Sequence, residues 1–469
     1  MPLILGTNSI KDTGYDVDNS CRFDDGSNCQ MRRSGVDGGD QDKFTLSMWI
    51  KRGAISTSFP RLFTSRADAN DRFEIYFGSN DSLYIEGVDN GSTTLNLNTN
   101  RKFRDPSAWF HFLLAVDTDQ GTASNRAKLY INGVQETSFA TETYPSQDGN
   151  IGINTSSFPI QIGEEAGNGV DFDGYLTEIV FLDGVQKTNT DFGEFDEDSG
   201  IWKPIDVSGL SSEKGNNGFY LDFEDSSNLG NDVFGGTDFT VSNLTAIDQS
   251  TDTCTNNFAT MNPLDVHPGG TYTFSDGNLT VEQDISRGTL STFGLSSGKW
   301  YAEAKFISTS GSDCIIGVVG INTTANEDPG IQATGYMYNQ DGTKKNNNSS
   351  SSYGNTYTTG DIVGIALDLD NNKIYFSKNG TFQNSGDPTS GSSGTGSAFT
   401  LTDPASTPTG FYFFAHADEL STNKVSWNYG SAPYSISSGN TDGNGYGNFE
   451  YAVPSGYYAL NSKNLAEYG

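Results

Sequence analysis

Positively charged residues are scarce in this 469-residue chain. Lysine and arginine together number 27 against 59 aspartates and glutamates, which gives a formal net charge of −32 at pH 7. Such an excess of negative charge repels phosphate groups, so we expect no nucleic-acid partner and no anionic membrane partner. A solvated acidic surface is the simplest interpretation, and solubility at high salt, calcium binding or an extracellular setting stay open beside it.

Long apolar runs are also missing. No stretch approaches the ~20 apolar residues of a membrane-spanning helix, so we expect no membrane insertion. The opening residues 1–6, MPLILG, are too few for a secretory signal peptide and lack its basic flank. We therefore expect synthesis in a cytoplasm without export by the usual route.

Cysteine and histidine are equally rare. The four cysteines are Cys21, Cys29, Cys254 and Cys314, too few for a disulfide scaffold. Cys21 and Cys29 flank a predicted turn over residues 24–28 and could face one another, so a disulfide and two free thiols both stay open. No CxxC spacing occurs, and the three histidines, His111, His267 and His416, are far apart in sequence, which argues against zinc.

The paired-carboxylate motif of glucanases is absent as well. A retaining glucanase needs two carboxylates about 5 Å apart on one strand face, usually as ExDxE. The nearest approach here is Asp171 and Asp173 with Glu178. No Cys–His signature is present, and His111 and His416 lie in apolar segments typical of a core. We expect no enzyme, no catalytic residue and no cofactor.

Glycine, aromatic residues and short alternating segments are abundant. The 55 glycines and 12% aromatic content suit many short strands joined by tight turns. Residues 44–51, FTLSMWIK, place Phe44, Leu46, Met48 and Ile50 on one strand face. Comparable segments recur at 73–77, 82–85, 109–116, 128–133 and 175–181. This spacing predicts β-sandwiches, and the length predicts two of them.

The order FTLSMWIKRG, WFHFLLAVD, LYINGV and FDGYLTEIVFLDG resembles the concanavalin A/laminin-G jelly roll, in the version found in bacteriophage virion and tail proteins. The resemblance covers roughly residues 21–264. Members of this family often hold calcium through loop oxygens, which draws attention to Asp68, Asn70 and Asp71 and to residues 194–198. Neither segment has EF-hand spacing, and solvated loops are the simpler interpretation, so no metal ligand is assigned.

Residues 360–382, GDIVGIALDLDNNKIYFSKNGTF, predict two strands joined by a turn at 370–372 and followed by an Asn-Gly turn at 379–380. This run resembles the central hairpin of SPRY domains. Residues 299–306, 314–321 and 424–430 resemble the flanking strands of the same family. The resemblance implies partner binding rather than catalysis.

The predicted fold class is all-β, with two tandem β-sandwich (jelly-roll) domains. The predicted parts are an N-terminal arm over 1–18 that could anchor the protein to a virion, a concanavalin A-like jelly roll over 19–247, a linker over 248–270, a SPRY-like sandwich over 271–434, and a C-terminal tail or final strand over 435–469.

These expectations combine in a non-enzymatic phage structural protein, a tail fibre or capsid-surface appendage that attaches to a host-cell surface glycan or protein. Tyrosine rings in polar loops can stack on sugars, so a ligand-binding loop face is predicted from Tyr336, Tyr338, Tyr353 and Tyr357. Rings packed under their own loops are the alternative.

The expected location is the virion, after synthesis in the host cytoplasm. The other expected partners are virion proteins and further copies of the chain, since virion subunits are commonly repeated by symmetry. Three alternatives stay open: a decoration or fibre subunit that binds mainly its neighbours, a secreted carbohydrate-active enzyme, and a cytosolic SPRY adaptor.

Overall fold

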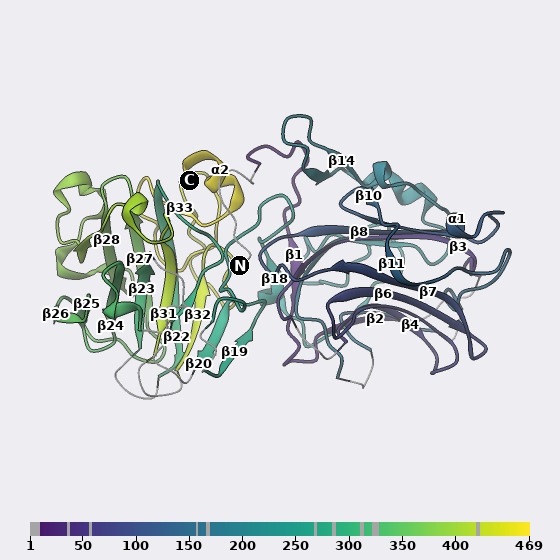
Figure 1. Cartoon of the computed structure of the whole chain (residues 1–469), viewed down its shortest axis with the longest axis horizontal. Coiled ribbons are helices and arrows are strands. Elements are labelled where there is room, and N and C mark those ends of the chain that lie inside the picture. The colour runs from purple at the N-terminus through teal and green to yellow at the C-terminus, as the bar shows by residue number, and fades with distance from the viewer. Residues whose placement is uncertain are drawn as a thin grey trace. The chain divides into compact units, whose positions relative to one another are not determined.

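The computed structural model describes residues 10–34, 38–55, 59–155, 158–165, 169–266, 270–283, 288–309, 314–320, 328–418 and 423–469. The chain divides into a first unit, Thr13–Thr255, and a second unit, Met1–Asp12 with Asn256–Gly469. Both units are built mainly from antiparallel strands (Figure 1), so the predicted all-β class with two sandwiches is confirmed. None of the helices in the described residues has the length and apolar character needed to cross a bilayer.

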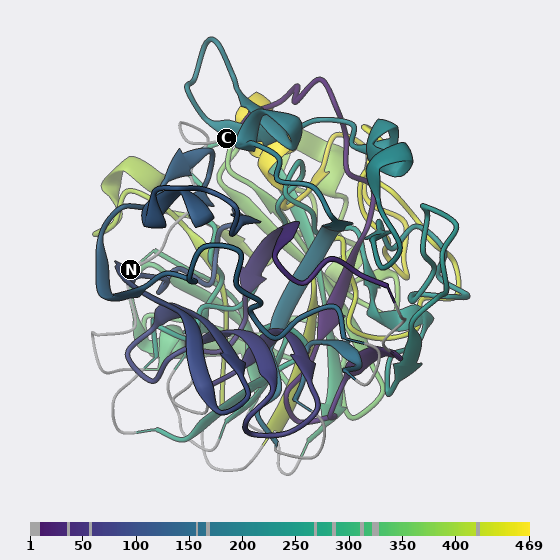
Figure 2. The ribbon, with the colours of Figure 1, turned by 90° about the vertical axis from the view of Figure 1, so that its right-hand side faces the viewer.

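The first unit consists of two large sheets, whose layers can be followed in Figure 1 and from a second direction in Figure 2. The first sheet has the order β10 (Val134–Gln135), β9 (Ala127–Ile131), β8 (Phe110–Asp117), β3 (Lys43–Arg52), β13 (Gly174–Asp183), β1 (Ser20–Phe23) and β18 (Gln249–Ser250), with β16 (Phe219–Leu221) also paired to β13. The second has the order β11 (Phe139–Thr143), β7 (Ser92–Lys102), β6 (Ser82–Asp89), β5 (Arg72–Phe77), β4 (Arg61–Arg66), β12 (Ile160–Ile162), β2 (Gln30–Arg33) and β17 (Thr240–Ser242).

Short elements complete the first unit. They are the paired strands β14 (Gly193–Phe195) and β15 (Trp202–Pro204), the helix α1 (Ala123–Arg126), and the 3₁₀-helices η2 (Asn189–Asp191), η3 (Ser208–Glu213) and η4 (Ala246–Asp248).

The core of the first unit lies between its two sheets. The predicted inward set on β3, Phe44, Leu46, Met48 and Ile50, is fully buried, and Phe44 packs edge-on against Phe73 of β5 at 5.5 Å between ring centroids. The other face of β3 and β13 is buried too, because residues after β13 cover it with a second apolar cluster. The chain thus alternates as predicted, but this sheet is covered on both faces.

The second unit repeats the two-sheet plan. One sheet has the order β19 (Tyr272–Ser275), β20 (Thr280–Gln283), β32 (Asn423–Asn428), β22 (Lys299–Ser308), β27 (Ile362–Asp368), β28 (Lys373–Lys378) and β29 (Thr381–Phe382), with β30 (Phe399–Thr400) on β28 and β33 (Tyr458–Ala459) parallel to β22. The other has the order β21 (Thr289–Leu290), β31 (Phe413–Ala417), β23 (Ile315–Val319), β24 (Gly335–Asn339), β25 (Thr343–Asn346) and β26 (Ser349–Ser352). Its helices are η6 (Pro329–Ile331), η7 (Gln383–Ser385), η8 (Pro388–Ser393), η9 (Pro404–Ser406) and α2 (Ser462–Tyr468).

The predicted central hairpin of the second unit is present as β27 and β28. Val363 pairs with Lys378 at one end and Asp368 with Lys373 at the other. Both predicted turns use left-handed asparagine, since Asn372 has φ 55° and Asn379 has φ 47°. Asparagine tolerates this backbone conformation, which is why the turn positions could be predicted from sequence.

The two units begin and end at other residues than the predicted arm and linker. Residues 13–18 belong to the first unit, where Thr13 and Val17 are buried; residues 1–9 of the predicted arm lie outside the described residues. The described part of the predicted linker, 248–266, is shared between the two units, because Phe258 and Met261 are buried in the second.

The segment 435–469 was predicted as a C-terminal tail or final strand. Tyr458 and Ala459 form the predicted final strand, but it is only two residues long and is followed by α2. Leu460 and Leu465 are buried, and Asn461 caps the helix by accepting a hydrogen bond from the backbone N–H of Asn464. The segment therefore belongs to the fold of the second unit.

Candidate ligand and metal sites

A cavity of about 210 Å³ opens in the first unit where β7 ends and β8 begins. We call it the basic pocket. Its lining residues are Arg101, Lys102, Phe103, Arg104, Asp105, Ala108, Trp109, Phe110, Ile131 and Asn132. The chain from 101 to 110 forms most of it, and the end of β9 supplies the rest.

Strand register brings the two parts of the pocket together. On β8 and β9, Phe112 pairs with Ile131, which places Asn132 beside His111. Asn132 holds this position by accepting a hydrogen bond from the backbone N–H of His111 at 2.7 Å through its Oδ1 atom. Asn132 and Gly133 both have positive φ, as a two-residue hairpin turn of this type requires. The sequence Asn-Gly therefore fixes this wall of the pocket.

The floor of the pocket is aromatic. The rings of Phe103 and Phe110 lie 4.8 Å apart and both pack on Phe77. Trp109 is partly exposed, and its indole Nε1 donates to Oδ1 of Asp252 at 2.9 Å. The indole is thus held at its polar edge while part of its surface stays accessible, an arrangement that suits stacking on a sugar ring.

Cations surround this aromatic floor. Nε of Arg101 pairs with Glu136 and Nε of Arg104 pairs with Asp81, each at 2.8 Å, while Lys102 is exposed. Sequence reasoning missed these residues. The signal was present, since RKFR at 101–104 places three cations within four residues of a strongly acidic chain.

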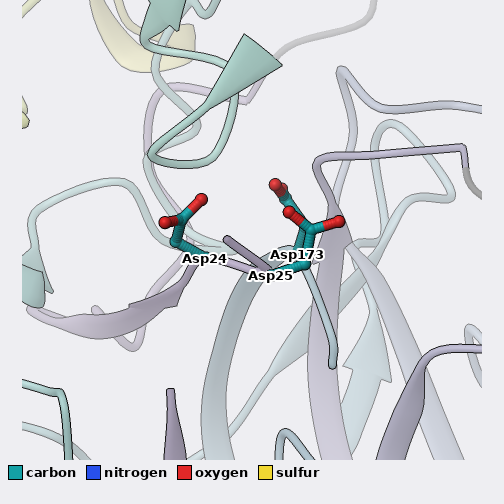
Figure 3. Close-up of side chains that lie close together, drawn as sticks. All are labelled: Asp24, Asp25 and Asp173. Atoms are coloured by element: carbon teal, nitrogen blue, oxygen red, sulfur yellow. The ribbon is translucent and has the colours of Figure 1, made fainter. Parts of the chain in front are cut away.

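A cluster of carboxylates forms a second candidate site. Asp24 and Asp25 lie on the loop after β1, and Asp173 lies just before β13 (Figure 3). The pairing of Phe23 with Gly174 brings the loop and Asp173 side by side. One oxygen from each of the three residues lies within 4.8 Å of the others, close enough to share one divalent cation.

The surroundings of this cluster are also acidic. Burial, followed by the neighbouring carboxylates of Glu164 and Asp25, raises the pKa of Asp171 to about 6. Burial and the charge of Asp24 raise the pKa of Asp25 above its ordinary value. A bound cation would relieve this repulsion, so Asp24, Asp25 and Asp173 are the residues that could hold a metal ion.

Of the three carboxylates nearest to a glucanase pattern, Asp171 and Asp173 lie at the acidic cluster and Glu178 does not join them. Asp173 belongs to the acidic cluster, whereas Glu178 accepts a hydrogen bond from the hydroxyl of Tyr220 at 2.8 Å. Four residues lie between the two along the chain, and Glu178 stands at a bulge of β13 with a φ of 51°. Glu178 is also 5% exposed, so its carboxyl group is poorly accessible to a substrate.

The two described histidines are core residues, as their apolar segments predict. Trp202 Nε1 donates to Nδ1 of His111 at 3.2 Å, and Ser47 Oγ lies 2.8 Å from Nε2. Because an indole nitrogen only donates, Nδ1 is the acceptor and Nε2 carries the proton toward Ser47. His111 is therefore not placed to take a proton from Ser47, and burial lowers its pKa to about 3.

In the second unit, Trp427 Nε1 donates in the same way to Nδ1 of His416 at 3.0 Å. Burial lowers the pKa of His416 to about 3 as well. The third histidine, His267, lies outside the described residues.

The predicted ligand-binding tyrosines do not form an exposed face. The exposed fractions of Tyr336, Tyr338, Tyr353 and Tyr357 are 4%, 0%, 8% and 2%. Tyr338 packs between the sheets, with its ring 5.3 Å from that of Phe376 on β28. The hydroxyl of Tyr357 points at the carbonyl oxygens of Cys314 and Tyr338, at 2.9 and 2.8 Å. The prediction of an exposed face was wrong, because these rings fill the core beneath a polar hairpin.

In the oxygen-rich loops named from the sequence, carboxylate oxygens accept hydrogen bonds from residues of the same loop. Oδ1 of Asp68 accepts hydrogen bonds from the backbone N–H groups of Asn70 and Asp71, at 2.7 and 3.2 Å. Asp196 accepts from the backbone and hydroxyl of Ser199 in the same fashion. Cys21 and Cys29 are both buried free thiols.

Comparison with known proteins identifies a domain in each unit. Residues 24–187 match the family described as the concanavalin A-like lectin/glucanases superfamily, and residues 299–399 match the SPRY domain. These two matches carry no information about a bacteriophage source.

The similarity to individual proteins covers only part of this chain. The ATP-dependent RNA helicase DDX1 of Xenopus laevis is 35% identical over 124 residues, which are 26% of this chain and 16% of the helicase. A putative carbohydrate binding protein from Bacteroides ovatus has a TM-score of 0.33 at 16% identity, covering 49% of this chain and 59% of its own. The SPRY domain of human HERC1 has a TM-score of 0.27 at 14% identity, covering 36% of this chain and 96% of its own. Likenesses at this level do not transfer function.

Proposed function

We propose that this chain is a non-enzymatic ligand-binding protein whose first unit binds a saccharide in the basic pocket. The chain carries a concanavalin A-like (laminin-G) domain and a SPRY domain. The observation that carries this proposal is the placement of partly exposed Trp109 among Arg101, Lys102 and Asn132 in one cavity. An aromatic face combined with a few polar groups is the usual composition of a saccharide site.

The size of the cavity supports a small ligand group. At about 210 Å³ it is smaller than the ~300–1,000 Å³ pockets that enclose drug-sized molecules. It suits one sugar residue of a longer chain, with the rest of the chain outside.

A binding role without catalysis is supported by the carboxylates. Glu178 is hydrogen-bonded to Tyr220, and neither Glu178 nor Asp173 lines the basic pocket. No reducing sugar should be released from a saccharide that binds.

The biological setting that we propose is the surface of a bacteriophage particle, where the chain serves as a tail fibre or capsid appendage and attaches to a host-cell glycan or protein. The resemblance of the sequence segments FTLSMWIKRG, WFHFLLAVD, LYINGV and FDGYLTEIVFLDG to phage virion jelly rolls supports this setting. A coding sequence beside capsid and tail genes would agree with it, and one beside polysaccharide-degradation genes would overturn it.

A glycan array tests the proposed binding. The variant Ala108→Phe fills the pocket with a ring, and Ala140→Phe places the same ring on β11, outside the pocket. We expect saccharide binding by the native chain and by Ala140→Phe, and its loss in Ala108→Phe. Equal binding by all three proteins would place the site elsewhere, and reducing sugar released from the bound glycan would overturn the non-enzymatic role.

A further inference from the structure

The basic pocket stands out by its charge. Three of the 27 lysines and arginines fall at 101, 102 and 104, and all three line the same cavity. In a chain of net charge −32, three cations at one cavity form a local feature that can attract an anionic group.

Two of these cations are held in fixed orientations. The Nε atoms of Arg101 and Arg104 pair with Glu136 and Asp81, whereas the side chains remain 49% and 61% exposed. A guanidinium bonded through Nε keeps its terminal nitrogens available, and their planar geometry matches a carboxylate, sulfate or phosphate. The two carboxylate partners are nearly buried, so the face presented to solvent is cationic.

Lys102 differs from its neighbours. Arg101 and Arg104 have ion-pair partners, but within the described part of the chain no carboxylate pairs with Lys102. Among the described residues, Asp105 is the carboxylate that lines the cavity, and its Oδ1 accepts from the backbone and hydroxyl of Ser107 at 2.9 and 2.6 Å. Lys102 is therefore available for a negative group that enters from solvent.

We infer that the basic pocket selects an acidic saccharide: Lys102, with the outer nitrogens of Arg101 and Arg104, binds the sugar's carboxylate, sulfate or phosphate while Trp109 stacks on its ring. This inference rests on the proposed saccharide-binding function and adds the ligand class. A neutral sugar would use the aromatic floor alone and would offer Lys102 no negative group.

Matched ligands test the charge directly. The probes are galacturonic acid trimer, the same trimer as its neutral methyl ester, and an array of sulfated and phosphorylated saccharides each paired with its unmodified form. We expect the acidic member of at least one pair to bind about tenfold or more tighter, as for a charged hydrogen bond. The preference should shrink as salt rises.

Matched variants test the residue. Lys102→Gln should remove most of the preference for the acidic member of a pair over its neutral form. Lys128→Gln removes one charge from β9 outside the pocket and should behave as the native chain. Thermal melting confirms that both variants fold.

The outcomes separate the two claims. Equal binding of acidic and neutral members, with loss in Ala108→Phe, would overturn the anionic class and keep the saccharide site. Retention of the acidic preference in Lys102→Gln would overturn the role of Lys102. Binding of no saccharide in any pair would overturn the proposed function and this inference together.

Discussion

The indole nitrogen of Trp109 donates a hydrogen bond to Oδ1 of Asp252 at 2.9 Å, and the other carboxylate oxygen of Asp252 accepts from Nζ of Lys51 at 2.6 Å. The register explains the arrangement, because Ile50 pairs with Phe110 and the next residues on the two strands are Lys51 and Trp109. One buried carboxylate thus ties the pocket's tryptophan to a buried lysine of the sheet.

Asp252→Ala should destabilise the first unit strongly. The substitution leaves Lys51, which is 0% exposed, with a buried charge and frees the edge of Trp109. Removing one partner of a buried ion pair commonly costs about 3–5 kcal/mol. Chemical denaturation of the whole chain measures the change in free energy of unfolding. A loss below about 1 kcal/mol would mean that Asp252 does not hold these two groups.

Glu178 should make stability depend on pH. Burial raises its pKa to about 8 from an ordinary 4.5, despite the hydrogen bond from Tyr220. The folded chain therefore keeps a proton that the unfolded chain releases above about pH 4.5, and the associated stability is lost as pH rises through about 8. The loss is on the order of a few kcal/mol, at about 1.4 kcal/mol per pKa unit.

The variant Glu178→Gln stays neutral at every pH and keeps an oxygen acceptor for Tyr220. Its melting temperature should resemble that of the native chain near pH 5 and exceed it near pH 9. Identical pH profiles for the two proteins would show that Glu178 is ionised in the folded chain at neutral pH.

Tyr357→Phe should affect stability and not ligand binding. It removes the hydroxyl that lies 2.9 Å from the carbonyl oxygen of Cys314 and 2.8 Å from that of Tyr338, which should cost about 1–2 kcal/mol. Urea denaturation measures the cost, and saccharide titration should give the native affinity. A loss of saccharide affinity at unchanged stability would show that Tyr357 contributes to ligand binding.

Binding in the basic pocket should not depend on divalent cations. Its polar lining is mainly cations and an amide, and Asp24, Asp25 and Asp173, which could hold an ion, do not line it. Calorimetric titration of the saccharide in EDTA and in calcium chloride should give the same affinity. Binding that requires calcium would move the ligand to the acidic cluster.

Local features of the fold were accessible from sequence. The hairpin β27–β28 uses residues 362–378 and turns at Asn372, so its strands, turn and pairing are encoded in one contiguous stretch. The alternation of β3 likewise predicted its buried face. Boundaries failed where apolar residues such as Phe258 and Met261 stand in an aperiodic segment, because burial there depends on distant partners.

The sites depend on pairings between distant residues. Asp24 approaches Asp173 only because β1 pairs with β13, and Asn132 reaches the basic pocket only because β9 pairs with β8. Tyr338 was wrongly predicted to be exposed for the same reason. A Ser-rich hairpin follows it in sequence, whereas its ring contacts Phe376 on the opposite sheet. The cationic run RKFR is visible in the sequence, but the cavity that it lines could not be predicted from it.

The most direct test of the account is the affinity of Trp109→Ala for the saccharide that the native chain binds best, measured by titration calorimetry. Phe195→Ala is the matched control, because Phe195 is 48% exposed in the same unit and does not line the pocket. The account predicts at least about a tenfold loss for Trp109→Ala, in line with a stacking aromatic at a binding hot spot, and native affinity for Phe195→Ala. Native affinity in a correctly folded Trp109→Ala variant would contradict it.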